Sequence, residues 1–78
     1  MEENRFNPEM LVLARLSCEM TQSDLAQKAE TTQGRLSKIE NGLLEPTDDL
    51  VEVFAKMLDY PVGFFYQSGH VRDRKTHV

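Results

Sequence analysis

The apolar residues of this chain recur at the spacing of α-helices rather than of β-strands. The clearest pattern lies between Thr47 and Pro61, where apolar side chains repeat every three or four positions and so share one face of a helix. This face consists of Leu50, Val53, Phe54, Met57 and Leu58. Almost nothing in the chain alternates apolar and polar residues as a half-buried strand does. The spacing therefore predicts an all-α fold.

Threonines divide the chain into short helices, because Thr is a favoured N-cap residue. Thr21, Thr32 and Thr47 each stand directly before a stretch with helical spacing. Asn41-Gly42 ends a helix, since both residues tolerate the left-handed conformation. The predicted helices run over 8–19 and 22–29, from Gln33 to Asn41, from Thr47 to Pro61, and over 62–66. We expect a five-helix bundle in which a tight turn joins the second helix to the third.

Length and composition leave room for one small domain. The chain has 78 residues and a net charge of −4, and its single cysteine, Cys18, fits a reducing compartment because it allows no internal disulfide. No apolar run approaches the roughly 18 residues that a membrane span needs. We expect an N-terminal arm over 1–7, a helical domain over 8–67 and a flexible basic tail over 68–78, in a cytoplasmic protein.

The residue pattern argues against an enzyme and against a metal protein. His70 and His77 stand in the tail without the cluster of Cys, Asp or Glu that would complete a metal site. Cys18 has no neighbouring His in the sequence, which favours a packing role over a nucleophilic one. No glycine-rich phosphate loop occurs. The sequence therefore predicts no catalytic residue, no metal and no cofactor.

Residues 21–42 read TQSDLAQKAETTQGRLSKIENG. This segment closely resembles the helix-turn-helix of the XRE family, which contains the lambdoid phage repressors and Cro, and the resemblance extends over residues 6–66. It implies a lambda-repressor-like (Cro/C1-type) domain that binds double-stranded DNA. By this resemblance the chain is a nucleoid-associated bacterial or phage repressor. It would bind an inverted-repeat operator as a homodimer, with its third helix in the major groove.

The resemblance assigns base contacts to the third helix, whose N-terminal half faces base edges in such proteins. Gln33 carries an amide that can both donate to and accept from adenine. Arg35 can contact guanine with two hydrogen bonds, or can contact a phosphate. Lys38 can contact a groove edge or a phosphate, and Ser37 is a weaker candidate. Gln33 and Lys38 have an alternative interpretation as solvated surface side chains.

The resemblance also assigns contacts to the DNA backbone, which position a protein without reading sequence. Gln22, Thr32 and Asn41 match positions of this kind, with Gln22 at the start of a helix. Thr32 and Asn41 have structural roles as well, since one caps a helix and the other ends it. Arg15 and Glu40 resemble a salt bridge that joins the first helix to the third and so fixes the recognition helix.

Three positions inside the matched region depart from the family. Glu19 and Glu30 stand where glycine is common, so either the turns have adjusted or a non-glycine residue adopts strained left-handed geometry. Gly34 stands where the family often places a base-reading side chain. A glycine there costs helix stability, and it can allow close approach to the DNA.

The loop after the third helix lacks the Lys or Arg that relatives often use to hold phosphate. It carries Leu43, Leu44 and Glu45 instead. This apolar loop leaves a rival hypothesis open: the chain is a protein-interaction module on the same scaffold, such as an antitoxin-like or accessory subunit, and binds a protein partner through Leu43 and Leu44.

Three aromatic residues, Phe64, Phe65 and Tyr66, follow the last long helix. We expect one of them to belong to the core and at least one other to lie at an interface. Relatives dimerise through this region, and a two-fold dimer would read half-sites about 34 Å apart.

Overall fold

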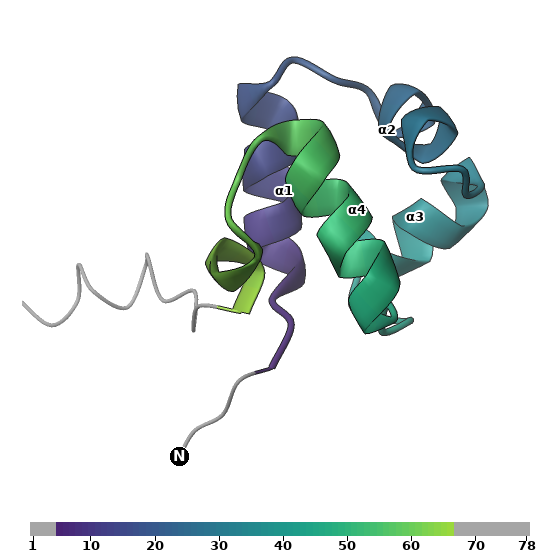
Figure 1. Cartoon of the computed structure of the whole chain (residues 1–78). Coiled ribbons are helices and arrows are strands. Elements are labelled where there is room, and N and C mark those ends of the chain that lie inside the picture. Colours follow the sequence, from purple (N-terminus) through teal and green to yellow (C-terminus); the bar gives the residue numbers. More distant parts are fainter. Residues whose placement is uncertain (1–4, 67–78) are drawn as a thin grey trace, which may run out of the picture.

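The computed structural model describes residues 5–66, and this range is helical without any strand (Figure 1). Its elements are α1 (Pro8–Ser17), α2 (Gln22–Lys28), α3 (Gln33–Glu40), α4 (Asp48–Leu58) and the 3₁₀ helix η1 (Val62–Tyr66). The all-α prediction is confirmed, but the count of five is not, because four of these elements are α-helices. The fifth element, η1, has only five residues and is a 3₁₀ helix instead. The start of the predicted arm and the whole predicted tail, residues 1–4 and 68–78, lie outside the described residues.

The three threonine caps are confirmed. The hydroxyl oxygens of Thr21, Thr32 and Thr47 each accept a hydrogen bond from the backbone N–H three residues later, at 3.0 to 3.1 Å. The first helix has a cap that the sequence analysis does not predict, because Asn7 Oδ1 accepts from the Glu9 N–H at 3.0 Å. Each cap satisfies an N–H group that the helix itself leaves without a partner, and so fixes where the helix begins.

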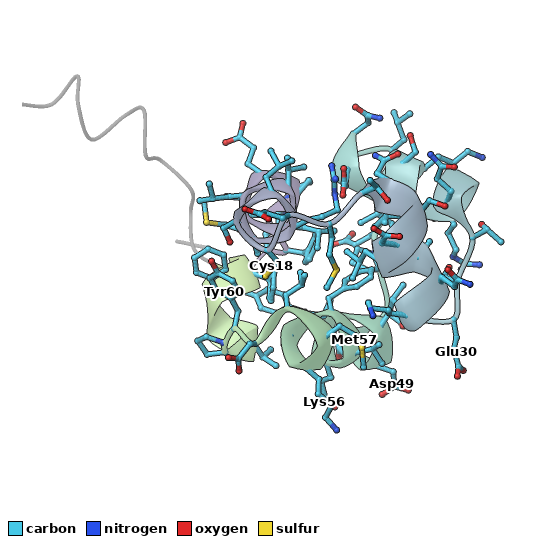
Figure 2. All side chains as sticks on the ribbon, turned by 90° about the horizontal axis from the view of Figure 1, so that it is seen from above. Cys18, Glu30, Asp49, Lys56, Met57 and Tyr60 are labelled. Atoms are coloured by element: carbon cyan, nitrogen blue, oxygen red, sulfur yellow. The ribbon has the colours of Figure 1, made fainter. Side chains whose placement is uncertain are left out.

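Three non-glycine residues in the described range adopt left-handed backbone, and each follows the end of a helix. Their φ angles are 59° for Glu19, 61° for Glu30 and 64° for Asp59. The turns at the two family glycine positions have therefore kept left-handed geometry, at a cost of about 1–2 kcal/mol each. Glu30 points away from the domain, so its side chain offsets little of that cost by packing (Figure 2). These turns also end α1 at Ser17 and α2 at Lys28, slightly earlier than predicted.

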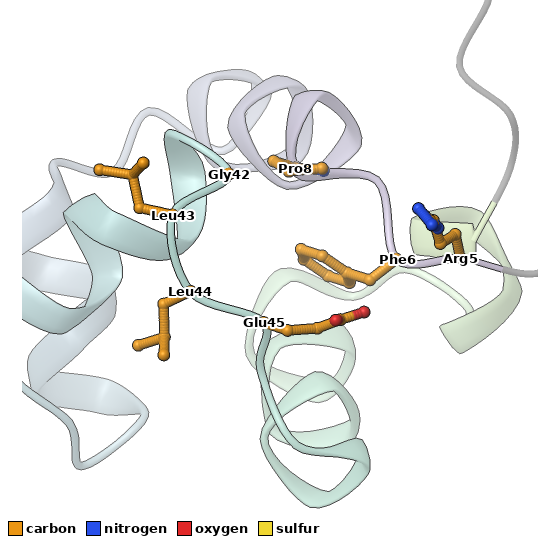
Figure 3. Close-up of a pocket in the computed structure, with 7 residues that line it drawn as sticks. All are labelled: Arg5, Phe6, Pro8, Gly42, Leu43, Leu44 and Glu45. Atoms are coloured by element: carbon orange, nitrogen blue, oxygen red, sulfur yellow. The ribbon is translucent and has the colours of Figure 1, made fainter.

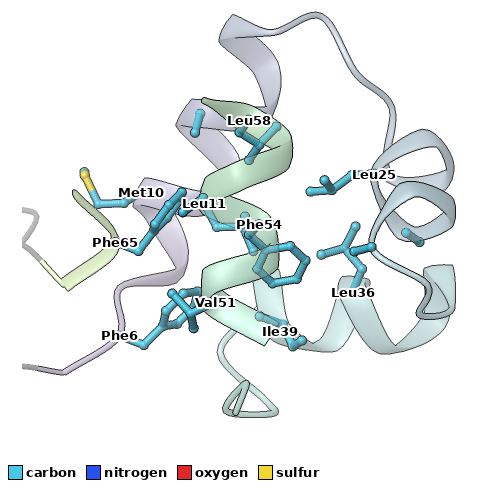
Figure 4. Close-up of a cluster of buried hydrophobic side chains, with 14 residues drawn as sticks. Phe6, Met10, Leu11, Leu25, Leu36, Ile39, Val51, Phe54, Leu58 and Phe65 are labelled. Atoms are coloured by element: carbon cyan, nitrogen blue, oxygen red, sulfur yellow. The ribbon is translucent and has the colours of Figure 1, made fainter. Parts of the chain in front are cut away.

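The core is built around α4, from which Val51, Phe54, Ala55 and Leu58 are buried. The ring of Phe54 points toward Leu36 of α3 (Figure 4). Leu11 and Ala14 of α1 and Leu25 of α2 complete the centre of the cluster, and each is inaccessible to solvent. The predicted stripe on α4 is wider than the buried face: Leu50 and Val53 are half-buried, and Met57 is 37% exposed.

Aromatic rings close the end of the core where the N-terminal segment meets η1. The backbone N–H of Asn7 donates to the carbonyl of Phe65 at 2.7 Å, and the ring of Phe6 stacks on that of Phe65 at a centroid distance of 6.5 Å. Phe65 is completely buried. It is therefore the core ring of the three predicted aromatic residues and has no surface to offer to a second copy, whereas Phe64 and Tyr66 are half-buried. Burial, and then the nearby Asp48 carboxylate, raise the pKa of the Tyr66 hydroxyl.

Candidate nucleic-acid interface

The outward side of α3 presents a row of small and polar residues. Leu36 and Ile39 are completely buried, which fixes the rotation of α3 about its axis. Residues at positions i, i+3, i+4 and i+7 share one side of a helix. On the side of α3 away from the core, and continuing into its C-cap, these residues are Gly34, Ser37, Lys38 and Asn41. Ser37 is half-buried and the other three are exposed. We refer to these four residues as the α3 row.

Gln33 and Arg35 are exposed on opposite flanks of the α3 row, because successive helix residues are about 100° apart. Gln33 lies on the α2 side, with its Nε2 3.5 Å from Oε1 of Gln22. Arg35 lies on the α4 side, where it lines a hollow of about 310 Å³ together with Glu30 and Asp49. Glu30 and Asp49 lie on the same side of the molecule in Figure 2. The structure therefore brings Gln33 next to Gln22 and places Arg35 on the other side of the helix.

Three helices are joined at the carboxylate of Glu40. Its Oε2 accepts from Arg15 Nε at 2.7 Å, and its Oε1 accepts from Arg15 Nη2 at 3.0 Å and from Gln22 Nε2 at 2.9 Å. Arg15 also donates from Nη1 to the carbonyl of Met20 at 2.9 Å. The predicted pair of Arg15 and Glu40 thus lies in contact. The bond from Gln22 has no signal in the sequence, because it depends on how α2 packs beside α3.

The cap residues of α3 use their side chains within the domain. The Thr32 hydroxyl accepts from the Arg35 backbone N–H at 3.1 Å, and Asn41 Nδ2 donates to the Ser37 carbonyl at 2.9 Å. Both residues are exposed, and each has a donor hydrogen that these bonds do not use, namely the Thr32 hydroxyl hydrogen and the second Nδ2 hydrogen of Asn41. The structural roles that the sequence analysis gave to these residues are present, and their polar surface remains accessible.

The charges that α3 exposes are positive. Arg35 and Lys38 are exposed cations, and the single carboxylate of the helix, Glu40, is held in the pair with Arg15 with only 5% of its side chain accessible. Within α3, which is described in full, no carboxylate therefore competes with these cations at the surface. A polyanion can approach this helix without meeting a like charge on it.

The loop after α3 places its two leucines differently. Leu43 is 75% exposed, whereas Leu44 is half-buried and packs against the core. Their side chains diverge from each other (Figure 3). Both line a hollow of about 450 Å³ between this loop and the segment before α1. Of the two leucines predicted to bind a protein partner, only Leu43 offers most of its side chain to a partner.

Neither a metal site nor a membrane span occurs in the part of the chain that the structure describes. Residues 5–66 contain no group of three or more His, Cys, Asp or Glu side chains that could hold a metal ion. No helix in this range combines the length and apolar character that crossing a bilayer requires. His70 and His77 lie outside the described residues. Cys18 is half-buried and its Sγ lies 3.4 Å from the Leu58 carbonyl, as the predicted packing role requires.

The four-helix arrangement and the exposed third helix define a helix-turn-helix protein. Residues 11–65 match the helix-turn-helix family HTH_3, and the chain belongs to this family, the XRE family that the sequence resembles. It is accordingly a member of a family of DNA-binding transcription regulators. No curated protein matches the chain.

Solved structures of bacterial regulators are similar to the chain. A point mutant of the restriction-modification controller protein C.Esp1396I is 32% identical, with a TM-score of 0.68 over 74% of this chain and 79% of that one. An HTH_3 family transcriptional regulator from Vibrio cholerae is 25% identical, with a TM-score of 0.67 over 74% of this chain and 33% of that one. The hypothetical transcription factor NHTF from Neisseria is 15% identical and shares the fold, with a TM-score of 0.75 over 91% of this chain and 79% of that one.

Proposed function

We propose that this protein is a cytoplasmic, sequence-specific repressor that binds an inverted-repeat operator as a homodimer, with α3 in the major groove. The observation that carries the proposal is the α3 row, together with the hydrogen bonds at Glu40 that hold α3 against α1 and α2. An exposed, polar helix face with only positive charge is held from behind by Arg15, Glu40 and Gln22. A rigid helix presented in this way suits the reading of base edges, because each hydrogen bond to a base requires a fixed donor and acceptor position.

Gln33 reads adenine in this proposal. The Glu40 carboxylate only accepts hydrogen bonds, so Gln22 directs its Nε2 toward Glu40 and its Oε1 outward. Gln33 then directs one Nε2 hydrogen toward Gln22 Oε1. The second Nε2 hydrogen and Oε1 of Gln33 remain available, and they match the N7 acceptor and N6 donor of adenine.

The remaining contacts divide between bases and the backbone. Ser37 and Lys38 belong to the α3 row and face the groove. Arg35 approaches from the α4 flank, where it contacts either a guanine or the phosphate beside it. Thr32, Asn41 and Gln22 would hold phosphates through donors: the Thr32 hydroxyl, the second Nδ2 hydrogen of Asn41 and the Gln22 backbone N–H at the start of α2. Of the three predicted aromatic residues, Phe64 and Tyr66 have accessible surface for the dimer contact.

The proposal is tested by enriching a random DNA duplex library on the purified protein at about 50 mM and about 200 mM salt. We expect an inverted repeat with half-sites about one helical turn apart. Arg35→Ala should relax the preference at one base position, whereas Lys56→Ala, which removes an exposed cation that points away from the domain (Figure 2), should leave the selected sequence unchanged. Absence of any enriched sequence at about 50 mM salt would refute sequence-specific binding.

The exposure of Leu43 favours a second candidate function, that of an antitoxin-like or accessory protein-interaction module. Leu43→Lys separates the two candidates. For a DNA-binding repressor the new cation sits beside the end of α3, so the substitution should strengthen operator binding at low salt and steepen its salt dependence. For an interaction module the same substitution should abolish binding of the partner protein, and the wild-type chain should select no DNA sequence.

A further inference from the structure

Gly34 has no role inside the described domain that requires glycine. Among the described glycines only Gly42 has positive φ, at 77°, so the backbone at Gly34 is accessible to any residue. A Cβ atom built at Gly34 meets nothing within 4 Å. Neither backbone geometry nor steric crowding in the folded chain explains the absence of a side chain here.

Glycine at this position weakens the helix. It is the second residue of α3, an eight-residue helix, and alanine is the better helix former at such a site. The chain therefore carries a destabilising residue on its exposed recognition helix without a compensating contact of its own. A reason for the glycine lies in whatever approaches this surface.

Gly34 lies at the N-terminal end of the α3 row, the part of the helix that enters deepest into a major groove. Gln33 precedes it, and Ser37 and Lys38 stand one turn later on the same side. The missing Cβ leaves the backbone of Gly34 bare and open on this side. The 5-methyl group of thymine is the apolar group that projects from base edges into the major groove.

We propose that Gly34 is a specificity-determining residue, and that its bare backbone receives the methyl group of a thymine in each half-site. The inference rests on the proposed function and deepens it. A Cβ at this position would occupy the space of the thymine methyl, so alanine would discriminate against thymine although it leaves the fold intact.

The test compares the wild-type protein with Gly34→Ala in the library enrichment, with Lys56→Ala as the control for an exposed helix position. The wild type should select thymine at one position in each half-site, and Gly34→Ala should lose that preference and bind the wild-type site about tenfold more weakly. Replacing that thymine by uracil, which lacks the methyl group, should weaken DNA binding by the wild type and strengthen DNA binding by Gly34→Ala. Gly34→Ala should also melt at a higher temperature than the wild type.

Three results would overturn the inference while leaving the proposed function in place. These are an unchanged base preference and affinity in Gly34→Ala, an equal loss on every DNA sequence including non-specific DNA, and a lower melting temperature of the variant. The equal loss would mean that a phosphate rather than a base approaches Gly34, and the lower melting temperature would mean that the glycine has a structural role. Failure of the wild type to enrich any sequence would instead refute the proposed function, and the inference with it.

Discussion

The Nε atom of Arg15 lies 2.7 Å from Oε2 of Glu40, and only 11% and 5% of the two side chains are exposed. This pair joins α1 to α3 on a side of α3 that faces away from Gly34 and Lys38. Gln22 adds α2 to the same carboxylate. The orientation of the recognition helix therefore depends on polar contacts as well as on the burial of Leu36 and Ile39.

Removing Arg15 should destabilise the domain strongly. Arg15→Ala leaves the Glu40 carboxylate in a nearly inaccessible position without its cation, which typically costs about 3–5 kcal/mol of unfolding free energy. Urea denaturation measures the loss. Arg35→Ala is the control: it removes an exposed arginine of α3 and should change stability by less than about 0.5 kcal/mol. A loss below about 1 kcal/mol in Arg15→Ala would mean that the pair behaves like a solvent-exposed one.

Glycine at Glu30 should stabilise the domain. Glu30→Gly relieves a left-handed strain of about 1–2 kcal/mol, and greater freedom of the unfolded chain offsets about 0.4–1 kcal/mol of the gain. We expect a net increase of about 0.5–1 kcal/mol in the free energy of unfolding. Gln27→Gly, in the regular part of α2, is the matched control and should lose about 1 kcal/mol. Thermal denaturation of both variants decides the point, and a lower melting temperature for Glu30→Gly would contradict the strain argument.

The caps Thr32 and Thr47 allow stability to be separated from DNA binding. Thr32→Ala and Thr47→Ala each remove one cap bond at 3.1 Å and should each cost about 1 kcal/mol in denaturant titrations. Only Thr32 lies beside the α3 row, so only Thr32→Ala should also weaken operator binding in a titration with a fixed duplex. Equal DNA affinity of the two variants would remove Thr32 from the proposed phosphate contacts.

Phe64 and Phe65 should respond differently to substitution by alanine. Phe65 is completely buried, so Phe65→Ala should cost about 3–5 kcal/mol of stability. Phe64 is half-buried, and its ring centroid lies 4.5 Å from that of Tyr60. Phe64→Ala should therefore cost less stability than Phe65→Ala. It should also weaken dimerisation, because the exposed part of the Phe64 ring belongs to the proposed dimer contact. Sedimentation analysis over a range of concentrations measures the second effect. A dimer constant unchanged by Phe64→Ala would place the interface elsewhere.

Local signals in the sequence predict most of the fold. The cap hydroxyls of Thr21, Thr32 and Thr47 act within three residues of themselves, so their sequence spacing is sufficient to locate three helix starts. The apolar spacing in α4 depends only on helix geometry. Asn7, directly before the predicted start of the first helix, carries the same kind of signal, because Asn is also a favoured N-cap residue.

The features that sequence does not predict depend on packing between elements. Phe64, Phe65 and Tyr66 have similar apolar character, and only the fit of η1 against the N-terminal segment decides that Phe65 is the buried ring. Arg35 and Asp49 line the same hollow only because of how α4 packs against α3, and this packing cannot be read from the sequence. Glu30 departs from the family pattern in the sequence, but only the backbone angles show that its turn remains left-handed.

The carboxylate of Glu40 sits behind α3, while Gly34, Ser37 and Lys38 point outward. The contacts that hold the helix and the outward-facing α3 row therefore occupy separate sides of one eight-residue helix, with Gln33 at the border between them. The outward residues can be exchanged as a set without disturbing the residues that hold the helix in place. A protein built in this way can diverge to new operators through a few substitutions, and its recognition surface is suited to grafting between members of the family.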